Sequence, residues 1–224
     1  MASNFAGAAR EIAAEFEAAS GVDARITAAS TGKLYAQVIN GAPFDVLLAA
    51  DRDRPQKLEA SGEGVSGTRF VYAVGALLLW SRELEDCRGA LNHPADLRIA
   101  IANPAIAPYG AAARQFLERA GLWDDVGPRL VTGENISQTL QFVASGNAEL
   151  GFIASAQQYA PSLPPASCTW PVPLSAYDPI VQEAILLQHG EDSDSAHAFL
   201  SFLRGPAARE IILKHGYRLA GDAR

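Results

Sequence analysis

The hydrophobic pattern along the chain alternates between amphipathic stretches and short apolar runs. In residues 6–19 apolar side chains recur at helical spacing, glutamates occupy the opposite face, and Gly21 follows where a helix would end. Residues 23–28 alternate between polar and apolar positions and predict a short strand, and 44–50 form an apolar run typical of a buried strand. A helical pattern over 33–39 separates the two. The first fifty residues therefore predict a helix followed by a strand–helix–strand unit.

The same alternation continues to the end of the chain. Residues 68–80, the most apolar run, predict one or two strands that cross into a second lobe, and the Pro- and Ser-rich residues 161–173 predict a connection that returns. Further strands are expected at 98–102, 129–132, 150–155 and 181–188, and helices at 53–61, 111–120, 137–145, 195–203 and 206–215. Strands that alternate with helices favour mainly parallel sheets covered by helices.

Residues 62–67 match the letter pattern G-x-G-x-x-G of dinucleotide-binding proteins. That interpretation requires a strand before the glycines and a helix after them. Here a helix precedes them and a strand follows, so the segment is interpreted as a loop.

Composition and charge narrow the class of protein. The chain has 224 residues, of which 49% are hydrophobic and 19% charged, and this balance favours a packed core over disorder. A formal charge of −7 disfavours nucleic acid as a partner, and no apolar run is long enough to span a membrane. Cys87 and Cys168 are either paired or free, since spacing alone cannot decide.

Residues that offer uncharged hydrogen-bond donors lie at several predicted strand-to-helix junctions. The start of a helix exposes unpaired N–H groups and the positive end of the helix dipole, and both favour an anion. None of these junctions has Lys or Arg at the cap, so an anion bound there would be held by neutral donors. The alternative is a set of ordinary helix caps. The junction residues are Ser3, Asn4, Ser30, Thr31, Pro108, Tyr109, Gly110, Asn135 and Ile136.

Four motifs together resemble a known family, the molybdate-binding proteins of ABC importers, within the wider class of periplasmic solute-binding proteins. They are Ala-Ser-Asn-Phe at 2–5, the long block from Ala29 to Asp51, Asn-Pro-Ala-Ile-Ala-Pro-Tyr-Gly at 103–110 and Ala-Ser-Gly-Asn-Ala-Glu-Leu-Gly-Phe at 144–152. The resemblance covers essentially the whole chain. It implies an α/β fold of two lobes, each a mainly parallel sheet flanked by helices, with the ligand in the interlobe cleft. The lobes expected are 1–72 plus 175–224 and 73–174.

The resemblance also implies which residues bind the oxyanion. Ile136 would contribute only its backbone N–H, and Thr31 is the better match of its pair for a hydroxyl ligand. Many members have a further tyrosine where this chain reads Ala154-Ser155, and Tyr109 is expected to supply that hydroxyl instead. No residue is expected to bind the metal directly, because molybdenum would be bound as the oxyanion. The implied set is Ser3, Asn4, Ser30, Thr31, Tyr109, Asn135 and Ile136.

Besides the missing tyrosine, the N-terminus also departs from the pattern of the family. Members of the family have a strand before the motif at 2–5 and a signal peptide before that strand, whereas this sequence begins inside the motif. We therefore expect a start placed within the natural protein and, from the family, a periplasmic location.

The function expected is that of a transport receptor. A monomer would bind molybdate or tungstate and deliver it to the permease subunits of an ABC importer, with no cofactor, no nucleic acid and no insertion into a membrane. The alternatives are a cytoplasmic oxyanion-sensing domain of a regulator and a receptor for another oxyanion such as sulfate or chromate. An enzyme using Ser30 or Thr31 is disfavoured, because no histidine or pair of carboxylates stands at these junctions to act as a base.

Overall fold

The structure is a computed structural model that describes residues 1–92, 97–160 and 163–222. The chain divides into two compact units, the first made of Met1–Gly75 with Val181–Arg224 and the second of Ala76–Ile180. The polypeptide therefore passes from one unit to the other twice, at residues 75–76 and 180–181. Both crossings lie a few residues later in the chain than the lobe boundaries expected from the sequence.

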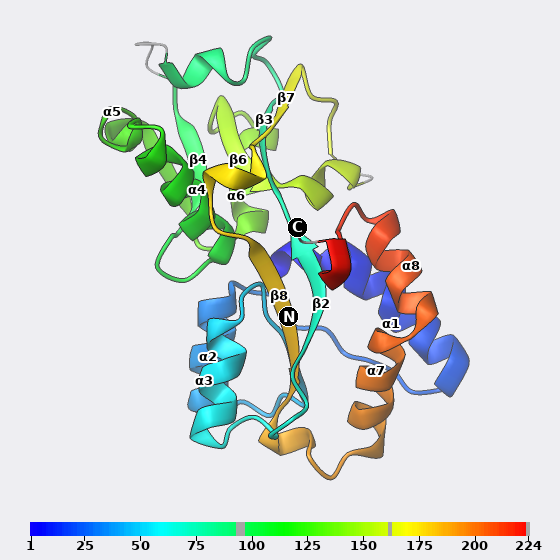
Figure 1. The fold of residues 1–224 in the computed structure, drawn as a ribbon. Helices are drawn as coiled ribbons and strands as arrows, with labels where there is room; N and C mark the ends of the chain where they lie inside the picture. Colours follow the sequence, from blue (N-terminus) through cyan, green and yellow to red (C-terminus); the bar gives the residue numbers. More distant parts are fainter. Residues whose placement is uncertain (93–96, 161–162, 223–224) are drawn as a thin grey trace. The chain divides into compact units, whose positions relative to one another are not determined.

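Unit 1 is built on a three-stranded sheet with the order β1-β8-β2, and helices cover both of its faces (Figure 1). Its strands are β1 (Val46–Leu48), β2 (Phe70–Gly75) and β8 (Ile180–Leu186). Helices α2 (Thr31–Ile39) and α3 (Asp53–Ser61) lie on one side, and α1 (Ala6–Ser20), α7 (Asp194–Arg204) and α8 (Pro206–Lys214) on the other. Leu34, Leu47 and Ile185 belong to one buried cluster that joins α2 to β1 and β8.

The strand predicted at 23–28 is not formed. The backbone pairing nearest to it is a parallel bridge between Ala2 and Ala29, one residue after the segment. The Ala29 N–H there donates to the Met1 carbonyl. A cavity of about 440 Å³ lies between residues 22–27 and the edge strand β1, with mostly apolar walls. The alternating pattern at 23–28 is thus that of a strand, but its backbone has no ladder partner over most of its length among the described residues.

Unit 2 is built on a five-stranded sheet with the order β5-β4-β6-β3-β7. The strands are β3 (Leu77–Ser81), β4 (Ile99–Ala102), β5 (Leu130–Gly133), β6 (Leu150–Ala154) and β7 (Cys168–Pro171). Helices α4 (Pro108–Arg119), α5 (Trp123–Val126) and α6 (Ile136–Ala144) complete the unit. Phe116 of α4 packs on Phe152, whereas Val143 of α6 packs with Ile153. Since adjacent strand residues point to opposite faces, α4 and α6 cover opposite faces of the sheet.

The predicted α/β class is confirmed, with a qualification on strand direction. Strand β4 is parallel to β5 and β6, as strand–helix–strand connections require, but β3 is antiparallel to β6 and β7, and β1 is antiparallel to β8. The antiparallel pairs all include β3 or β8, the strands at the two crossings, where the chain enters and leaves unit 2. No helix in the described part of the chain is long and apolar enough to cross a membrane.

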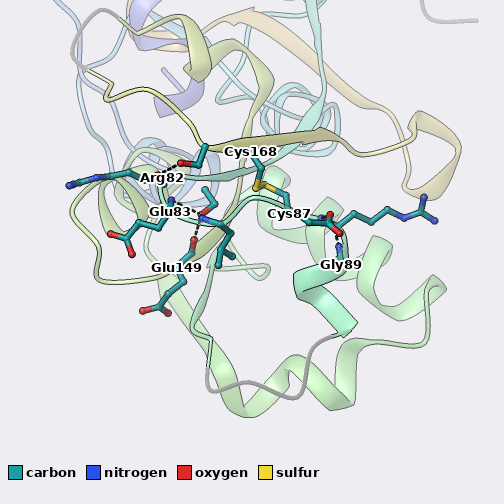
Figure 2. The surroundings of a disulfide bond; sticks show 11 residues. Arg82, Glu83, Cys87, Gly89, Glu149 and Cys168 are labelled. Atoms are coloured by element: carbon teal, nitrogen blue, oxygen red, sulfur yellow. Dashed lines mark hydrogen bonds between the residues drawn. A yellow bond between two sulfur atoms is a disulfide. The ribbon is translucent and has the colours of Figure 1, made fainter.

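Strand β7 and a disulfide were not predicted from the sequence. Residues 168–171 pair with β3 inside the stretch expected to be only a connection, whose residues 161 and 162 lie outside those described. Cys168 at the start of β7 is bonded to Cys87, with 5.7 Å between the Cα atoms (Figure 2). The open question of the two cysteines is thereby answered, and the edge strand β7 is covalently tied to the loop after β3.

Candidate functional site

Two of the predicted junctions in unit 1 lie side by side. The short 3-10 helix η1 (Ser3–Phe5) and helix α2 start next to each other, because the Ala2–Ala29 bridge joins the segments that precede them. The Ser3 N–H donates to the Ala29 carbonyl at 2.9 Å. These backbone bonds bring the predicted residues Ser3 and Asn4 beside Ser30 and Thr31.

Ser30 is the N-cap of α2, and its hydroxyl has no partner among the described residues. The backbone there is extended, as at a typical cap, but the side chain makes no capping hydrogen bond. Ser30 is 3% exposed, and within the described residues its Oγ is the one buried side-chain polar atom that lacks a hydrogen bond. A buried hydroxyl left unpaired costs about 1–3 kcal/mol, so this atom is set up to bond a group that the chain itself does not supply.

Thr31 has a different environment from its neighbour. It is fully buried, and its Oγ1 accepts a hydrogen bond from the Ala50 N–H at 3.1 Å, just after β1. The hydroxyl still has its proton to donate. Its acceptor capacity is used to fix the start of α2 against the end of β1, so Thr31 has a clear structural role in addition to the predicted ligand role.

The Asn4 side chain is buried, and both hydrogens of its amide nitrogen are engaged. Its Nδ2 donates to the Gln182 Oε1 at 2.9 Å and to the Tyr217 hydroxyl at 3.2 Å. Among the described residues none accepts a hydrogen bond from the Asn4 backbone N–H. That N–H lies in the first turn of η1, where helix geometry leaves donors unsatisfied.

The predicted residues of unit 2 stand at one edge of its sheet. Helix α4 follows β4 and α6 follows β5, and these parallel strands end in register at Ala102 and Gly133. The carboxyl ends of parallel strands in such a sheet are the usual place for a ligand. Gly110 allows α4 to approach the strand end closely, since a Cβ there would lie 2.1 Å from the Ala102 carbonyl oxygen. Tyr109, in the first turn of α4, is 2% exposed.

Asn135 and Ile136 form the capped start of α6. The Asn135 Oδ1 accepts hydrogen bonds from the N–H groups of Ser137 and Gln138, each at 3.0 Å. The cap therefore satisfies the second and third N–H groups of the helix and leaves the first, that of Ile136, without an acceptor among the described residues. The buried Gln157 holds this turn in place, because it donates to the Ile136 carbonyl at 3.2 Å and accepts from the Ala154 N–H at 2.9 Å.

The donors in both units are electrically neutral. None of the seven predicted residues is charged, and each set stands at the positive end of a helix, α2 in unit 1 and α4 and α6 in unit 2. Asp51, which would repel an anion, is paired with Arg54 and accepts from its N–H at 3.0 Å, so its carboxylate caps the start of α3. This donor chemistry suits an anion that sheds its water, and the described residues contain no cluster of three or more His, Cys, Asp or Glu fit for a metal ion.

Comparison with known proteins identifies the family. Residues 1–218 match the family model described as bacterial extracellular solute-binding protein. The chain belongs to this family. This chain is 44% identical over 222 residues to the molybdate-binding protein ModA of Azotobacter vinelandii, across 98% of this chain and 88% of that one. It is 42% identical to ModA of Rhodobacter capsulatus, across 97% of this chain and 86% of that one.

A solved structure gives the same result for the fold. The periplasmic molybdate-binding protein of Azotobacter vinelandii superimposes on the solute-binding protein with a TM-score of 0.91, across 97% of this chain and 96% of that one, at 38% identity. The family resemblance and the fold class inferred from the sequence are therefore confirmed.

Sequence reasoning missed the residues that support the site. Gln157, Gln182 and Tyr217 are buried and bond to predicted site residues, yet no motif marks them. Gln182 carries one signal that could have been noticed: with Glu183 it interrupts the apolar run Ile180–Leu186, on a strand with no exposed residue.

Proposed function

We propose that this solute-binding protein binds a tetrahedral oxyanion, molybdate and also tungstate, through neutral donors of both units. The proposed set remains Ser3, Asn4, Ser30, Thr31, Tyr109, Asn135 and Ile136. In this proposal the Ser30 hydroxyl and the backbone N–H groups of Asn4 and Ile136 donate to the anion, and Thr31 adds its hydroxyl proton.

The observation that carries the proposal is the buried, unpartnered Ser30 hydroxyl at the start of α2. A hydrogen bond to a charged partner contributes about 1.5–3 kcal/mol, so five to seven such bonds support a dissociation constant on the order of micromolar to nanomolar after binding costs. The identity of 44% to a protein named for molybdate binding supports the choice of anion.

We further propose that the protein acts in the periplasm as a monomer and delivers the anion to the permease of an ABC importer without altering it. The Cys87–Cys168 disulfide supports an oxidising compartment, because such bonds persist outside the cytosol and are rare within it. The absence of positive side chains from the donor set favours selection of the anion by its size and its protonation state over attraction by net charge.

Calorimetric titration with molybdate, tungstate and sulfate tests the proposal. Molybdate and tungstate should each bind with one site per chain and with similar dissociation constants, since their size and charge are nearly the same. Sulfate should bind at least a hundredfold more weakly, because a smaller anion cannot reach all the donors at hydrogen-bonding distance. Equal affinity for sulfate would overturn selection by size, and no binding of any of the three would overturn the function.

A further inference from the structure

A buried polar network lies beneath Asn4 in unit 1. It consists of the side chains of Asn4, Tyr72, Gln182 and Tyr217, which are between 0% and 6% exposed. They come from four separate segments, namely η1, β2, β8 and the residues after α8. Polar groups buried together in this way are costly unless every one of them is paired, so the pairing pattern is informative.

The hydrogen bonds of this network converge on the Asn4 amide. Gln182 Oε1 accepts from Asn4 Nδ2 and, at 3.0 Å, from the Tyr72 hydroxyl. The Tyr217 hydroxyl accepts from the same Nδ2 and donates to the Asn4 carbonyl at 2.7 Å. Asn4 is thus held at both its side chain and its backbone.

Both phenols stay protonated, as the network requires. Burial raises the pKa of Tyr72 and of Tyr217 above the ordinary value for tyrosine, so each keeps its O–H at neutral pH. The Phe5 ring packs edge-on against both phenol rings, with centroids 4.7 and 5.2 Å away. The two hydroxyls are therefore fixed in position as well as in protonation state.

An amide –NH₂ group has two hydrogens, and here Gln182 and Tyr217 take both. The Asn4 side chain has no N–H left for an anion, and its remaining oxygen would repel one. The part of Asn4 suited to an anion is its backbone N–H, and the side chain acts as an anchor that sets where this N–H points.

From this geometry we propose that Gln182 and Tyr217 are positioning residues for the anion site, acting through the Asn4 side chain. The inference rests on the proposed function and adds a role for two residues that lie outside the proposed donor set and bond to Asn4. Gln182 lies on β8 just after the chain returns to unit 1, and Tyr217 is fixed by the bridge between Arg218 and Val74 of β2. The network thereby ties η1 to both strands through which the chain leaves and re-enters the unit.

A double-mutant cycle on molybdate affinity tests this role. Gln182→Met keeps the size of the side chain but removes the acceptor, and it should weaken molybdate binding about tenfold in the wild-type background. In the Asn4→Ala background, where no side-chain amide remains to be positioned, the same change should alter affinity less than twofold. A general loss of stability would instead act equally in both backgrounds, and that result would overturn the proposal, as would no loss in either.

A matched control and a second variant guard against misfolding. Ser81→Ala removes a buried hydroxyl that donates to the Glu149 carbonyl at 2.6 Å in unit 2, and it should leave molybdate affinity within twofold of wild type. Tyr217→Phe removes the other partner of Asn4 and should also weaken binding about tenfold. If Gln182→Met does not fold, the hydrogen-exchange measurement described next tests the positioning role with Tyr217→Phe alone.

Nuclear magnetic resonance of the ligand-free protein tests whether Gln182 and Tyr217 hold Asn4, independently of whether the protein binds an oxyanion. With ¹⁵N-labelled asparagine, the two Nδ2 protons of Asn4 should exchange slowly with solvent in wild type and at least tenfold faster in Gln182→Met and Tyr217→Phe. Unchanged protection in both variants would overturn the positioning role. If wild type binds no oxyanion, the proposed function fails, while this exchange measurement still decides whether the two residues hold Asn4.

Discussion

Ser30 and Thr31 are adjacent hydroxyl residues at the start of α2, yet their oxygens have different surroundings. The Ser30 Oγ is buried and finds no partner in the described part of the chain, whereas the Thr31 Oγ1 accepts from the Ala50 N–H. The resemblance favoured Thr31 as the hydroxyl ligand, and that remains a prediction. The structure adds a physical reason to expect that the Ser30 hydroxyl contributes to anion binding as much as the Thr31 hydroxyl, or more.

The substitution Ser30→Ala separates binding from stability. It removes a donor to the anion but no hydrogen bond within the described protein, so molybdate affinity should fall about tenfold or more, the effect of roughly 1.5–3 kcal/mol. The free energy of unfolding of the ligand-free protein should stay the same or rise. Calorimetry and urea denaturation check the two expectations, and a clear loss of stability with unchanged affinity would make Ser30 an ordinary structural cap.

Thr31→Val is the matched comparison at the next position. It leaves the buried Ala50 N–H without its acceptor, which should lower the free energy of unfolding by about 1–3 kcal/mol. Affinity should fall as well, because the donated proton is lost and an apolar methyl group replaces the hydroxyl. If Thr31→Val unfolds at the same urea concentration as wild type, the hydrogen bond to Ala50 is of no consequence for folding.

Ile136→Pro removes one donor from unit 2 with little disturbance to the helix. Proline is favoured at the first position of a helix, and Asn135 before it already has the extended backbone that proline requires. Molybdate affinity should fall about tenfold or more from loss of a single N–H. Ile136→Val, which keeps the N–H, is the control and should bind like wild type; equal affinity of the proline variant would exclude this N–H as a ligand.

The junction residues could be found from the sequence because helix starts have a local signature. Asn135 before Ile136 is a typical cap, and it behaves as one. Gln182 and Tyr217 could not be found in the same way. Their role depends on contacts with Asn4 across 178 and 213 positions of the chain, and no local pattern encodes such contacts.

At the scale of elements, Glu11 joins α1 to the end of α8 through contacts with Lys214 and His215. Its carboxylate accepts from Lys214 at 2.6 Å and contacts His215 Nε2 at 2.9 Å. These hydrogen bonds, that of Lys214 first, lower the pKa of Glu11 below its ordinary value. The stabilisation is therefore present above the unfolded-state pKa and is lost as the pH falls through the folded-state pKa.

In the Glu11→Gln variant the free energy of unfolding should therefore depend less on pH in the acid range. Between about pH 7 and pH 4 the wild type should lose more unfolding free energy than the variant, because the variant has no charge to neutralise. Urea denaturation at both pH values measures the difference. Glu15→Gln, at an exposed position of the same helix, is the control and should follow wild type; identical acid dependence of all three proteins would refute the role of Glu11.

The disulfide makes a prediction about β7. Cys87 and Cys168 are 81 positions apart, so their bond restricts the unfolded chain considerably, and its loss should lower the free energy of unfolding by about 2–4 kcal/mol. Thermal unfolding with and without reductant shows the effect. The double variant Cys87→Ser/Cys168→Ser should be insensitive to reductant, and a wild type that is equally insensitive would show that the bond adds no stability.

Most elements could be predicted from periodicity, and the exceptions have physical reasons. The helix expected at 53–61 is observed at those residues, because Asp51 accepts from the Arg54 N–H at its start and Gly62, with a left-handed backbone, ends it. Strand β7 was missed because it has only four residues, lies in a stretch rich in proline and serine, and pairs with β3, far away in sequence. Residues 23–28 have the strand signal but form no strand, since strands need partners and sequence patterns do not show whether a partner is present.

At the scale of the molecule, the division into two units follows from the chain leaving unit 1 after β2 and returning in β8. The apolar run at 68–80 indicated the first crossing, and Ala76 separates β2 from β3 within it. Each unit contributes its own helix starts with neutral donors. We propose that these two sets of donors, from two separately packed units, bind a single dianion.

A calorimetric titration of molybdate into wild type, Ser30→Ala and Ile136→Pro tests this claim most directly, because the two variants each remove one donor from a different unit. The account predicts one anion per wild-type chain, the same stoichiometry in both variants, and affinity reduced about tenfold or more in each. Two anions per chain, or an affinity that depends on the donors of only one unit, would contradict it.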